Sequence, residues 1–393
     1  MRSVGEIVTT IGKTRGRQPE RLFGIRQSDR LFHTYVIGQT GTGKSTLLSQ
    51  LIKQDIANGQ GCCLIDPHGD LARSIAEVAG EGAIHWDAAD PACPVGYNPL
   101  TYVAEQYRPL VASGLIETLK KQWADAWGAR MEHLLRHALL ALLSRPGSTL
   151  QDIIPMFLET GFRTKVTADL TDEQVRHFWT VEYPKMNYKT AVDGVAPIAN
   201  KLGVFLAHPT VRNAVCIPEK PLRFREIMDE GRVLVVNLAK GQLGADVANT
   251  LGGLIVSSFA LAAYSRQSQP ESARRPYFLY VDEFHSFTTS AFTDMLSELR
   301  KYRLGLVLSH QYTSQVDKAV LDAILGNVGT LIVFRVGASD AAVFAKQLAS
   351  NVPERPDLVN LPNYQAYMKL MVSGVQTRAF SAKTIPSEFL QTQ

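Results

Sequence analysis

Short apolar runs alternate with helix-like segments over the first hundred residues of the chain. Tyr35–Ile37, Cys62–Ile65 and Ala83–Trp86 are runs of strand length. Helical patterns extend from Lys44 to about Ile56 and from His68 to Val78. Strands that alternate with helices of about 10–15 residues predict a mostly parallel sheet with helices on both faces.

The pattern changes from about Thr101 to Pro221, where the strand-like runs disappear. Met131–Leu143 repeats apolar residues at helical spacing. Ser148–Asp152 and Leu170–Gln174 are typical of capped helix starts. Residues 101–221 are therefore predicted to form an all-helical insertion.

The alternation of strand-like and helix-like segments resumes after this helical block. The later apolar runs are Arg232–Leu238, Tyr277–Val281, Leu304–Leu308, Leu331–Phe334 and Ala366–Met371. We expect an α/β core split into residues 31–100 and 222–393, with the helical domain inserted between its third and fourth strands.

One uncharged stretch, Val247–Tyr264, reaches the lower length limit for a membrane span. It contains polar residues such as Asn249 and Thr250, and it lies between two strand-like segments. We therefore predict a helix buried against the sheet, a chain that does not insert directly into a membrane, and a cytoplasmic location.

Composition and charge change this picture only at the N-terminus. Hydrophobic residues make up 45% of the 393 positions, which is typical of a globular protein rather than a disordered one. Residues 1–30 hold seven basic and three acidic side chains, so their surplus of four equals the net charge of +4 of the whole chain. This segment is interpreted as a basic arm that contacts phosphate backbones, although a solvated arm without a partner explains the charge equally well.

Gly38–Ser45 reads GQTGTGKS and matches the phosphate-binding pattern GxxxxGK[ST], directly after a strand and at the start of a helix. Its backbone N–H groups and the helix N-terminus are suited to binding the phosphates of ATP. We expect Lys44 to neutralise phosphate oxygens and the Ser45 hydroxyl to bind Mg²⁺. The candidate nucleotide-binding residues are Gly38, Thr40, Gly41, Thr42, Gly43, Lys44, Ser45 and Thr46.

Two consecutive acids, Asp282 and Glu283, follow the apolar run Phe278–Val281. The carboxyl ends of strands in open α/β sheets are where ligands bind. Asp282 is the candidate carboxylate for Mg²⁺, and Glu283 is the candidate base that orients the attacking water. The pair favours an ATPase motor over a GTPase switch, and the sequence contains no Asn-Lys-x-Asp guanine-reading motif.

Further candidates follow on the next strand. Gln311 ends the strand after the acids and is suited to sensing the γ-phosphate or the attacking water. Arg300, in the basic cluster before that strand, is the candidate arginine for a neighbouring subunit's nucleotide, ahead of Arg303 and Arg335. Asp66 ends the second strand, where shaping the site and capping the following helix are equally good explanations.

Taken in order, these segments resemble the HerA/FtsK superfamily. The motifs are IGQTGTGKST from Ile37, LIDPHGDL from Leu64, YVDEF from Tyr280 and RKYRLGLVLSHQ from Arg300. YNPL at Tyr97–Leu100, FRVGASDA from Phe334 and LPNYQAYMKL from Leu361 narrow the likeness to the TraG/TraD-type coupling proteins of conjugation and type IV secretion. The likeness covers most of residues 30–380.

The resemblance implies a RecA-like motor that works as a homo-hexameric ring with DNA in its channel. It matches Lys44 and Ser45 to the phosphate loop, Asp282 and Glu283 to the paired acids, Gln311 to the sensing glutamine and Arg300 to the finger arginine. Membrane-anchored relatives begin with transmembrane helices, and HerA proteins carry an N-terminal β-barrel. The chain is expected to have neither, which favours a coupling-type ATPase recruited to the inner membrane by other proteins.

Three functions remain open from the sequence. The first is a translocase that pumps DNA, single- or double-stranded, past loops such as Gln242–Asp246 or Phe284–Phe292, which ordinary connecting loops explain equally well. The second is a docking or assembly ATPase, which recruits a relaxase or a secretion-channel protein through its helical domain. The third is a HerA-type DNA-processing motor.

Overall fold

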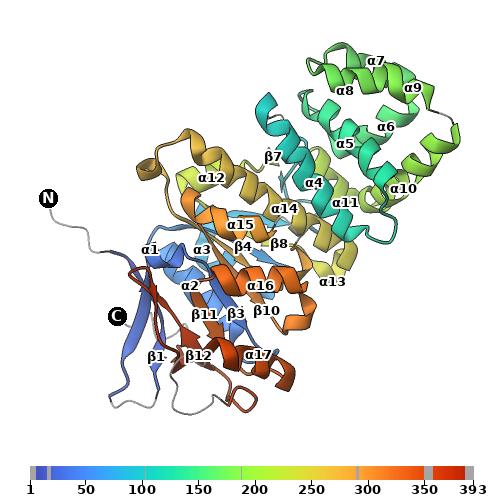
Figure 1. The fold of residues 1–393 in the computed structure, drawn as a ribbon. Coiled ribbons are helices and arrows are strands. Elements are labelled where there is room, and N and C mark those ends of the chain that lie inside the picture. The colour runs from blue at the N-terminus through green and yellow to red at the C-terminus, as the bar shows by residue number, and fades with distance from the viewer. Residues whose placement is uncertain are drawn as a thin grey trace. The chain divides into compact units, whose positions relative to one another are not determined.

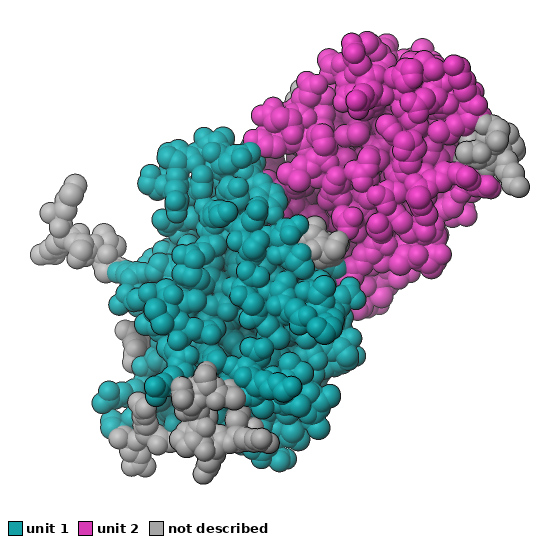
Figure 2. Space-filling view, viewed as in Figure 1, with its two compact units in different colours: residues 1–85, 225–237, 262–393 teal, residues 86–224, 238–261 magenta. Residues whose placement is uncertain are grey.

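The computed structural model describes residues 6–15, 19–101, 103–186, 188–288, 292–348 and 357–385. The chain divides into two compact units (Figure 2). Unit 1 comprises residues 1–85, 225–237 and 262–393, and unit 2 comprises residues 86–224 and 238–261.

An 11-stranded sheet is the framework of the fold, and its strands run in the order β2-β1-β15-β12-β11-β3-β10-β9-β4-β8-β5. The strands are β1 (Val8–Thr14), β2 (Leu22–Arg26), β3 (Thr34–Ile37), β4 (Gly61–Asp66), β5 (Ile84–Asp87), β8 (Val233–Asn237), β9 (Tyr277–Val281), β10 (Leu304–His310), β11 (Thr330–Val333), β12 (Gln365–Lys369) and β15 (Phe380–Thr384). The run from β11 to β8 is parallel throughout, whereas β12, β15, β1 and β2 pair antiparallel. The predicted mostly parallel α/β sheet is confirmed.

The N-terminal segment, which was interpreted as a basic arm, contributes two strands to the sheet. Residues 8–14 form β1 and residues 22–26 form β2, and β1 lies beside the C-terminal β15, so that blue and red segments are neighbours in Figure 1. Ile11 and Ile25 are buried, and Arg30 is 3% exposed. The apolar residues of β1 and β2 are interrupted by glycines and basic residues, so the sequence pattern did not predict these strands. Arg2 and Arg17 lie outside the described residues.

Helices cover both faces of the sheet in unit 1. They are α1 (Gln27–Arg30), α2 (Lys44–Ala57), α3 (Asp70–Ala79), α12 (Phe224–Glu230), α15 (Phe292–Glu298), α16 (Lys318–Asn327) and α17 (Ala338–Leu348). Adjacent residues of β3 show the two faces, because side chains alternate along a strand. Val36 packs in one core cluster with Leu47 of α2, whereas the ring of Tyr35 contacts Phe344 of α17. Two short strands, β13 (Met371–Val372) and β14 (Val375–Gln376), form a separate hairpin.

Unit 2 is mostly helical. Its elements are α4 (Arg108–Gln122), α5 (Ala129–Leu143), α6 (Ile153–Leu158), α7 (Thr160–Ala168), α8 (Glu173–His177), α9 (Tyr183–Lys185), α10 (Tyr188–Ala207), α11 (Pro209–Cys216), α13 (Lys240–Leu243), most of α14 (Ala245–Ser265) and the short strands β6 (Val95–Gly96) and β7 (Lys220–Pro221). Thr149 and Asp152 form the predicted capping box, and Asp172 caps α8. The unit's boundaries differ from residues 101–221, so the inserted domain with those limits stays a prediction.

The uncharged stretch Val247–Tyr264 lies within α14. By length and composition, Ala245–Ser268 passes the test for a membrane-crossing helix, and 72% of its apolar window is buried in the structure. Leu251, Ile255 and Phe259 are fully buried or nearly so. The core helix of a globular protein can be equally long and apolar, and burial of this extent fits the predicted helix packed inside the protein.

Candidate functional site

The phosphate loop forms where β3 ends and α2 begins. Gly41 has a φ of 75° and Gly43 a φ of 118°, in the region where glycine avoids the strain of a side chain. A Cβ on Gly38 would lie 2.6 Å from the Cβ of Phe334, so this position also has no room for a side chain. The loop therefore turns sharply and presents the N-terminus of α2 to the pocket.

Lys44 is 6% exposed, at the first position of α2. Its ammonium Nζ donates to the carbonyl oxygens of Gly38 at 2.6 Å and Gln39 at 3.2 Å. Burial lowers the pKa of Lys44, and the charges of Glu283 and Asp282 oppose that effect. The cation is thus held inside the loop's curve by carbonyl groups of the loop itself.

Asp282 follows β9 and is 7% exposed. Its Oδ1 accepts hydrogen bonds from the hydroxyl of Ser309 at 2.9 Å and from the backbone N–H of Glu283 at 3.1 Å. Burial raises the pKa of Asp282 to about 6, and the nearby carboxylates add to the rise. Such a carboxylate gains most from a cation placed beside it.

Glu283 adopts a left-handed backbone conformation with a φ of 47°, which is unusual for a residue with a side chain. Its Oε1 accepts a hydrogen bond from Nε2 of Gln311 at 3.0 Å. Its Oε2 accepts no hydrogen bond from the described residues and lies 3.4 Å from Nδ1 of His285. One carboxylate oxygen is held in place and the other remains available for a ligand or a water.

These side chains line one cavity of about 640 Å³, within the range of ligand sites. Its lining is Thr40, Gly41, Gly43, Lys44, Ser45, Thr46, Ser49, Lys53, Asp66, His68, Asp70, Leu71, Ser74, Asp282, Glu283, Gln311 and Tyr364. The structure thus brings together Lys44, Ser45, the two acids and Gln311. The oxygens of Ser45 and Asp282, with the glycine cradle, form a donor set that fits a magnesium-bound nucleotide.

Two predicted loop residues support the cavity without lining it. Gly38 supplies a carbonyl to Lys44. The Thr42 hydroxyl donates to the carbonyl of Gln39 at 2.7 Å, and the Thr42 carbonyl accepts from the backbone N–H of Tyr364 at 2.8 Å.

Asp66 has both of the roles considered for it. It lines the cavity. It also accepts hydrogen bonds from the backbone N–H groups of His68 and Ala72, both at 2.9 Å, which fixes the start of α3.

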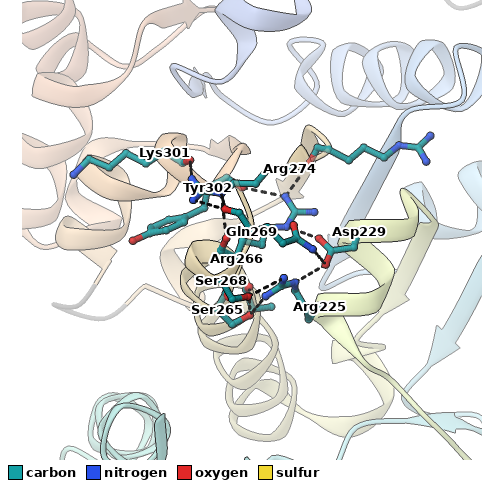
Figure 3. Close-up of polar contacts among 11 residues, drawn as sticks. Arg225, Asp229, Ser265, Arg266, Ser268, Gln269, Arg274, Lys301 and Tyr302 are labelled. Atoms are coloured by element: carbon teal, nitrogen blue, oxygen red, sulfur yellow. Dashed lines mark hydrogen bonds and ion pairs between the residues drawn. The ribbon is translucent and has the colours of Figure 1, made fainter. Parts of the chain in front are cut away.

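Arg300 does not line the cavity of its own chain. It is exposed, and its guanidinium carbon lies 3.4 Å from the ring centroid of Phe32. Two other arginines donate hydrogen bonds to the backbone of the turn that carries it, Leu299–Tyr302 (Figure 3). Arg266 donates to the carbonyl of Tyr302 at 3.0 Å, and Arg274 donates to that of Lys301 at 2.6 Å. Arg300 is therefore presented on a fixed backbone.

The other arginine and loop candidates lie elsewhere. Arg335 donates to the side chain of Gln39 at 3.3 Å and to the carbonyl of Leu361 at 3.1 Å, beside the phosphate loop. Arg303 ends the turn with a φ of 58°. Gln242–Asp246 spans the junction of α13 and α14 in unit 2. In Phe284–Phe292, residues 289–291 lie outside the described part, and the three phenylalanines of the segment are buried.

Several residues around the acids were not predicted from the sequence. Ser309 contacts Asp282, and its signal was a small polar residue at the end of an apolar strand. The hydroxyl of Tyr35 lies 2.5 Å from Nε2 of His310. Burial, and after it the charges of His285 and Lys44, lower the pKa of His310 to about 3. Tyr364 joins the cavity from the start of β12, and nothing in its local sequence indicated this.

This fold and cavity define a P-loop NTPase with a RecA-like core. Residues 29–101 match the family model for the central domain of helicase HerA. No curated protein matches the chain by sequence.

Several solved structures share the fold over nearly the whole chain. The bacterial conjugative coupling protein TrwB is 19% identical, with 92% of this chain and 87% of that chain covered and a TM-score of 0.66. VirB4 of Thermoanaerobacter pseudethanolicus is 14% identical, with 98% of each chain covered and a TM-score of 0.67. A further TrwB structure, 18% identical with a TM-score of 0.63, covers 91% of this chain and 86% of that one, and it holds ADP and Mg²⁺. These matches confirm the resemblance to HerA/FtsK-type P-loop ATPases related in fold to conjugative coupling proteins.

Proposed function

We propose that the protein is an ATP-driven DNA translocase of the coupling-protein type. It would work as a homo-hexameric ring in conjugative transfer or in a related type IV secretion or mobile-element process. The pairing of Glu283 with Gln311 inside the phosphate-loop cavity is the observation that carries the enzymatic part. The likeness of fold to TrwB and VirB4 supports the biological setting.

The roles of the residues follow from their positions. The backbone N–H groups of the loop Gly38–Thr46 bind the phosphates, and Lys44 exchanges its loop carbonyls for phosphate oxygens. The exchange is favourable because a buried ammonium gains more from an anion than from neutral carbonyls. Glu283 accepts the proton of the attacking water through its Oε2, while Gln311 holds Oε1 and keeps the carboxylate in orientation.

ATP and Mg²⁺ are the proposed substrate and cofactor. The Ser45 hydroxyl and the Asp282 carboxylate would hold the cation, which supplies positive charge to the phosphate oxygens. Asp282 is prepared for that role because Ser309 and the Glu283 amide orient its carboxylate.

The remaining parts of the proposal concern partners. DNA would pass through the ring with contacts mainly to its phosphates. Arg300, which is exposed and absent from its own cavity, would reach the nucleotide of the neighbouring subunit. A relaxase or a secretion-channel protein would bind residues 101–221 and recruit this cytoplasmic ATPase to the inner membrane.

ATP hydrolysis by the purified protein, with and without single- and double-stranded DNA, tests the proposal. We expect DNA to raise the rate, and the specific activity to rise with protein concentration as subunits assemble. The Arg300→Ala variant should lose that concentration dependence, because the residue acts on a neighbour. Glu283→Gln serves as the control for contaminating ATPases.

Two results would contradict the proposal. A rate of ATP hydrolysis that no DNA changes would exclude the translocase. It would favour a docking ATPase, whose rate responds to a protein partner instead. Wild-type activity in Arg300→Ala at all concentrations would exclude Arg300 as the residue that acts on a neighbouring subunit.

A further inference from the structure

Tyr364 occupies an unusual place beside the phosphate loop. Its backbone N–H donates to the Thr42 carbonyl at 2.8 Å, and its own carbonyl accepts from the Thr384 N–H at 2.9 Å. Its ring lies against Gly43, where an added Cβ would come within 2.9 Å of the ring's Cδ1. Two strands and the phosphate loop therefore fix this residue from both sides.

The backbone of Tyr364 has a φ of 64°, which is rarely adopted by an aromatic residue. Strained conformations of this kind persist where the surroundings hold them, and they are concentrated at binding sites. A glycine or an asparagine would relieve the strain, so the tyrosine side chain itself accounts for the choice of residue.

The ring is also exposed more than a structural tyrosine requires. Tyr364 is 42% exposed, and apart from the imidazole of His68 it is the single aromatic side chain among the residues that line the cavity in the described part of the chain. Apart from Leu71, the rest of the lining is polar, charged or glycine. Beyond its contact with Gly43, the ring therefore presents exposed apolar surface to a cavity whose described lining is mostly polar.

The direction of a bound nucleotide places its base on the side of Tyr364. The γ-phosphate must face Asp282 and Glu283, which follow β9, and β9 lies beyond β10 on one side of β3. The other neighbour of β3 is β11, followed by β12, which begins directly after Tyr364. With its phosphates in the loop, the nucleotide therefore extends its base away from the acids and toward β11 and β12.

We propose that Tyr364 is the stacking platform for the nucleobase of the bound nucleoside triphosphate. Stacking uses the π-face that every base has, so Tyr364 strengthens binding without selecting adenine by hydrogen bonds. The larger face of a purine gains more from it than that of a pyrimidine. This inference rests on the proposed function only in that the cavity binds a nucleoside triphosphate.

The test compares ATP with inorganic triphosphate, which has the phosphates but no base. Affinities are measured by calorimetry in the Glu283→Gln background, so that ATP is not consumed. Tyr364→Ala should weaken ATP binding roughly 5- to 150-fold, the range for loss of one base–aromatic stack. It should leave triphosphate binding unchanged. GTP should lose affinity by a similar factor, and CTP by less.

Matched variants separate stacking from other effects. Tyr364→Phe keeps the ring and should bind ATP like the parent. Tyr367→Ala removes a tyrosine of β12 that does not line the cavity, and it should change neither ligand's affinity.

Equal losses for ATP and triphosphate would mean that Tyr364 only supports the loop, and that result overturns the proposal. Unchanged ATP binding in Tyr364→Ala overturns it as well. If the parent binds neither ligand and Lys44→Ala makes no difference, the proposed function fails together with this inference.

Discussion

Two groups of charged and polar side chains in unit 1 differ in their hydrogen bonding. In the core, Arg30 and Asp55 are 3% and 1% exposed and form a two-pronged ion pair, at 2.5 Å and 2.8 Å. The hydroxyl of Tyr280 joins both partners, and the Arg30 guanidinium also lies over the ring of Phe278. Both Nη atoms of Arg30 thus have acceptors supplied by the fold.

The second group lines the cavity and consists of Lys44, Asp282, Glu283 and Gln311. Its charged side chains lack some of the hydrogen-bond and ion-pair partners that Arg30 and Asp55 have. Lys44 is bound to carbonyls rather than to an anion. Glu283 has an oxygen without a hydrogen bond from the described residues, and the pKa of Asp282 is raised. The difference separates structural from functional charge, because unpaired buried charge is costly and persists where a ligand completes it.

Replacing Glu283 with Gln should produce the largest effect on activity. We expect the rate of ATP hydrolysis to fall about 10²- to 10⁴-fold, the contribution of a general base. Stability should not fall, because the Oε2 atom has no hydrogen-bond donor to lose among the described residues. Steady-state hydrolysis and thermal unfolding measure the two effects, with the exposed Glu298→Gln as control. If Glu283→Gln were strongly destabilised but still active, Glu283 would belong with the charges that support the fold, and the comparison would be wrong.

Asp55→Ala should have the opposite profile. Removing one partner of a buried ion pair costs about 3–5 kcal/mol, because Arg30 would remain charged in the core. Chemical denaturation measures this loss, and the exposed Lys318–Asp322 pair provides a control, since Asp322→Ala should change stability little. The double variant Arg30→Met, Asp55→Leu should recover much of the stability. A double variant as unstable as Asp55→Ala would show that the pair has more than a packing role.

Asp282→Asn should sharpen the comparison through its pH dependence. The folded-state pKa of about 6 lies above the ordinary 3.8, so the folded protein holds this proton more tightly. The stability from that proton is present below the ordinary pKa and is lost as the pH rises through about 6. Asp282→Asn does not lose this stability, because an asparagine side chain does not titrate in this pH range.

The stability advantage of Asp282→Asn should therefore grow by about 1–2 kcal/mol between pH 5 and pH 8. Urea unfolding of both proteins at each pH gives the difference, in which the titration of other groups cancels. An advantage that shrinks as the pH rises would contradict the raised pKa.

Asp229→Asn tests a group of intermediate burial and should have the smallest effect. Asp229 is 26% exposed and accepts from Arg225, Arg266 and Gln269 (Figure 3). Arg266 would keep the carbonyls of Arg275 and Tyr302 as acceptors. We expect a loss of about 1 kcal/mol, because the amide oxygen of the asparagine still accepts hydrogen bonds and only the strengthening by the charge is removed. Denaturation measures it, and a loss as large as that of Asp55→Ala would remove burial as the explanation.

Much of the site was predictable because its residues carry local signals. The loop Gly38–Ser45 needs glycines at fixed spacing, and the acids at 282 and 283 follow a strand of continuous apolar residues. The parallel strands on which they lie were also correctly predicted, since each is a buried apolar run. Their common edge follows from the rule that parallel strands end on the same side.

Other parts had no such signal. The strands β1 and β2 contain glycines and basic residues, and β15, which pairs with β1, lies more than 350 residues away along the chain. Ser309, Tyr364 and the Arg30–Asp55 pair acquire their roles from contacts between distant segments. Arg300 was predicted to reach the nucleotide of a neighbouring subunit. The hydrogen bonds that Arg266 and Arg274 donate to the turn carrying Arg300 were not predicted.

The sequence by itself determined the phosphate loop, the paired acids and the parallel strands that carry them, because local backbone geometry and burial dictate those residue types. Only the tertiary structure decided which charges have partners. Register and packing join β12 to the phosphate loop, Gln311 to Glu283 and Arg30 to Asp55. Whether a buried charge supports the fold or waits for a ligand depends on such partners, and residues far apart in the chain supply them.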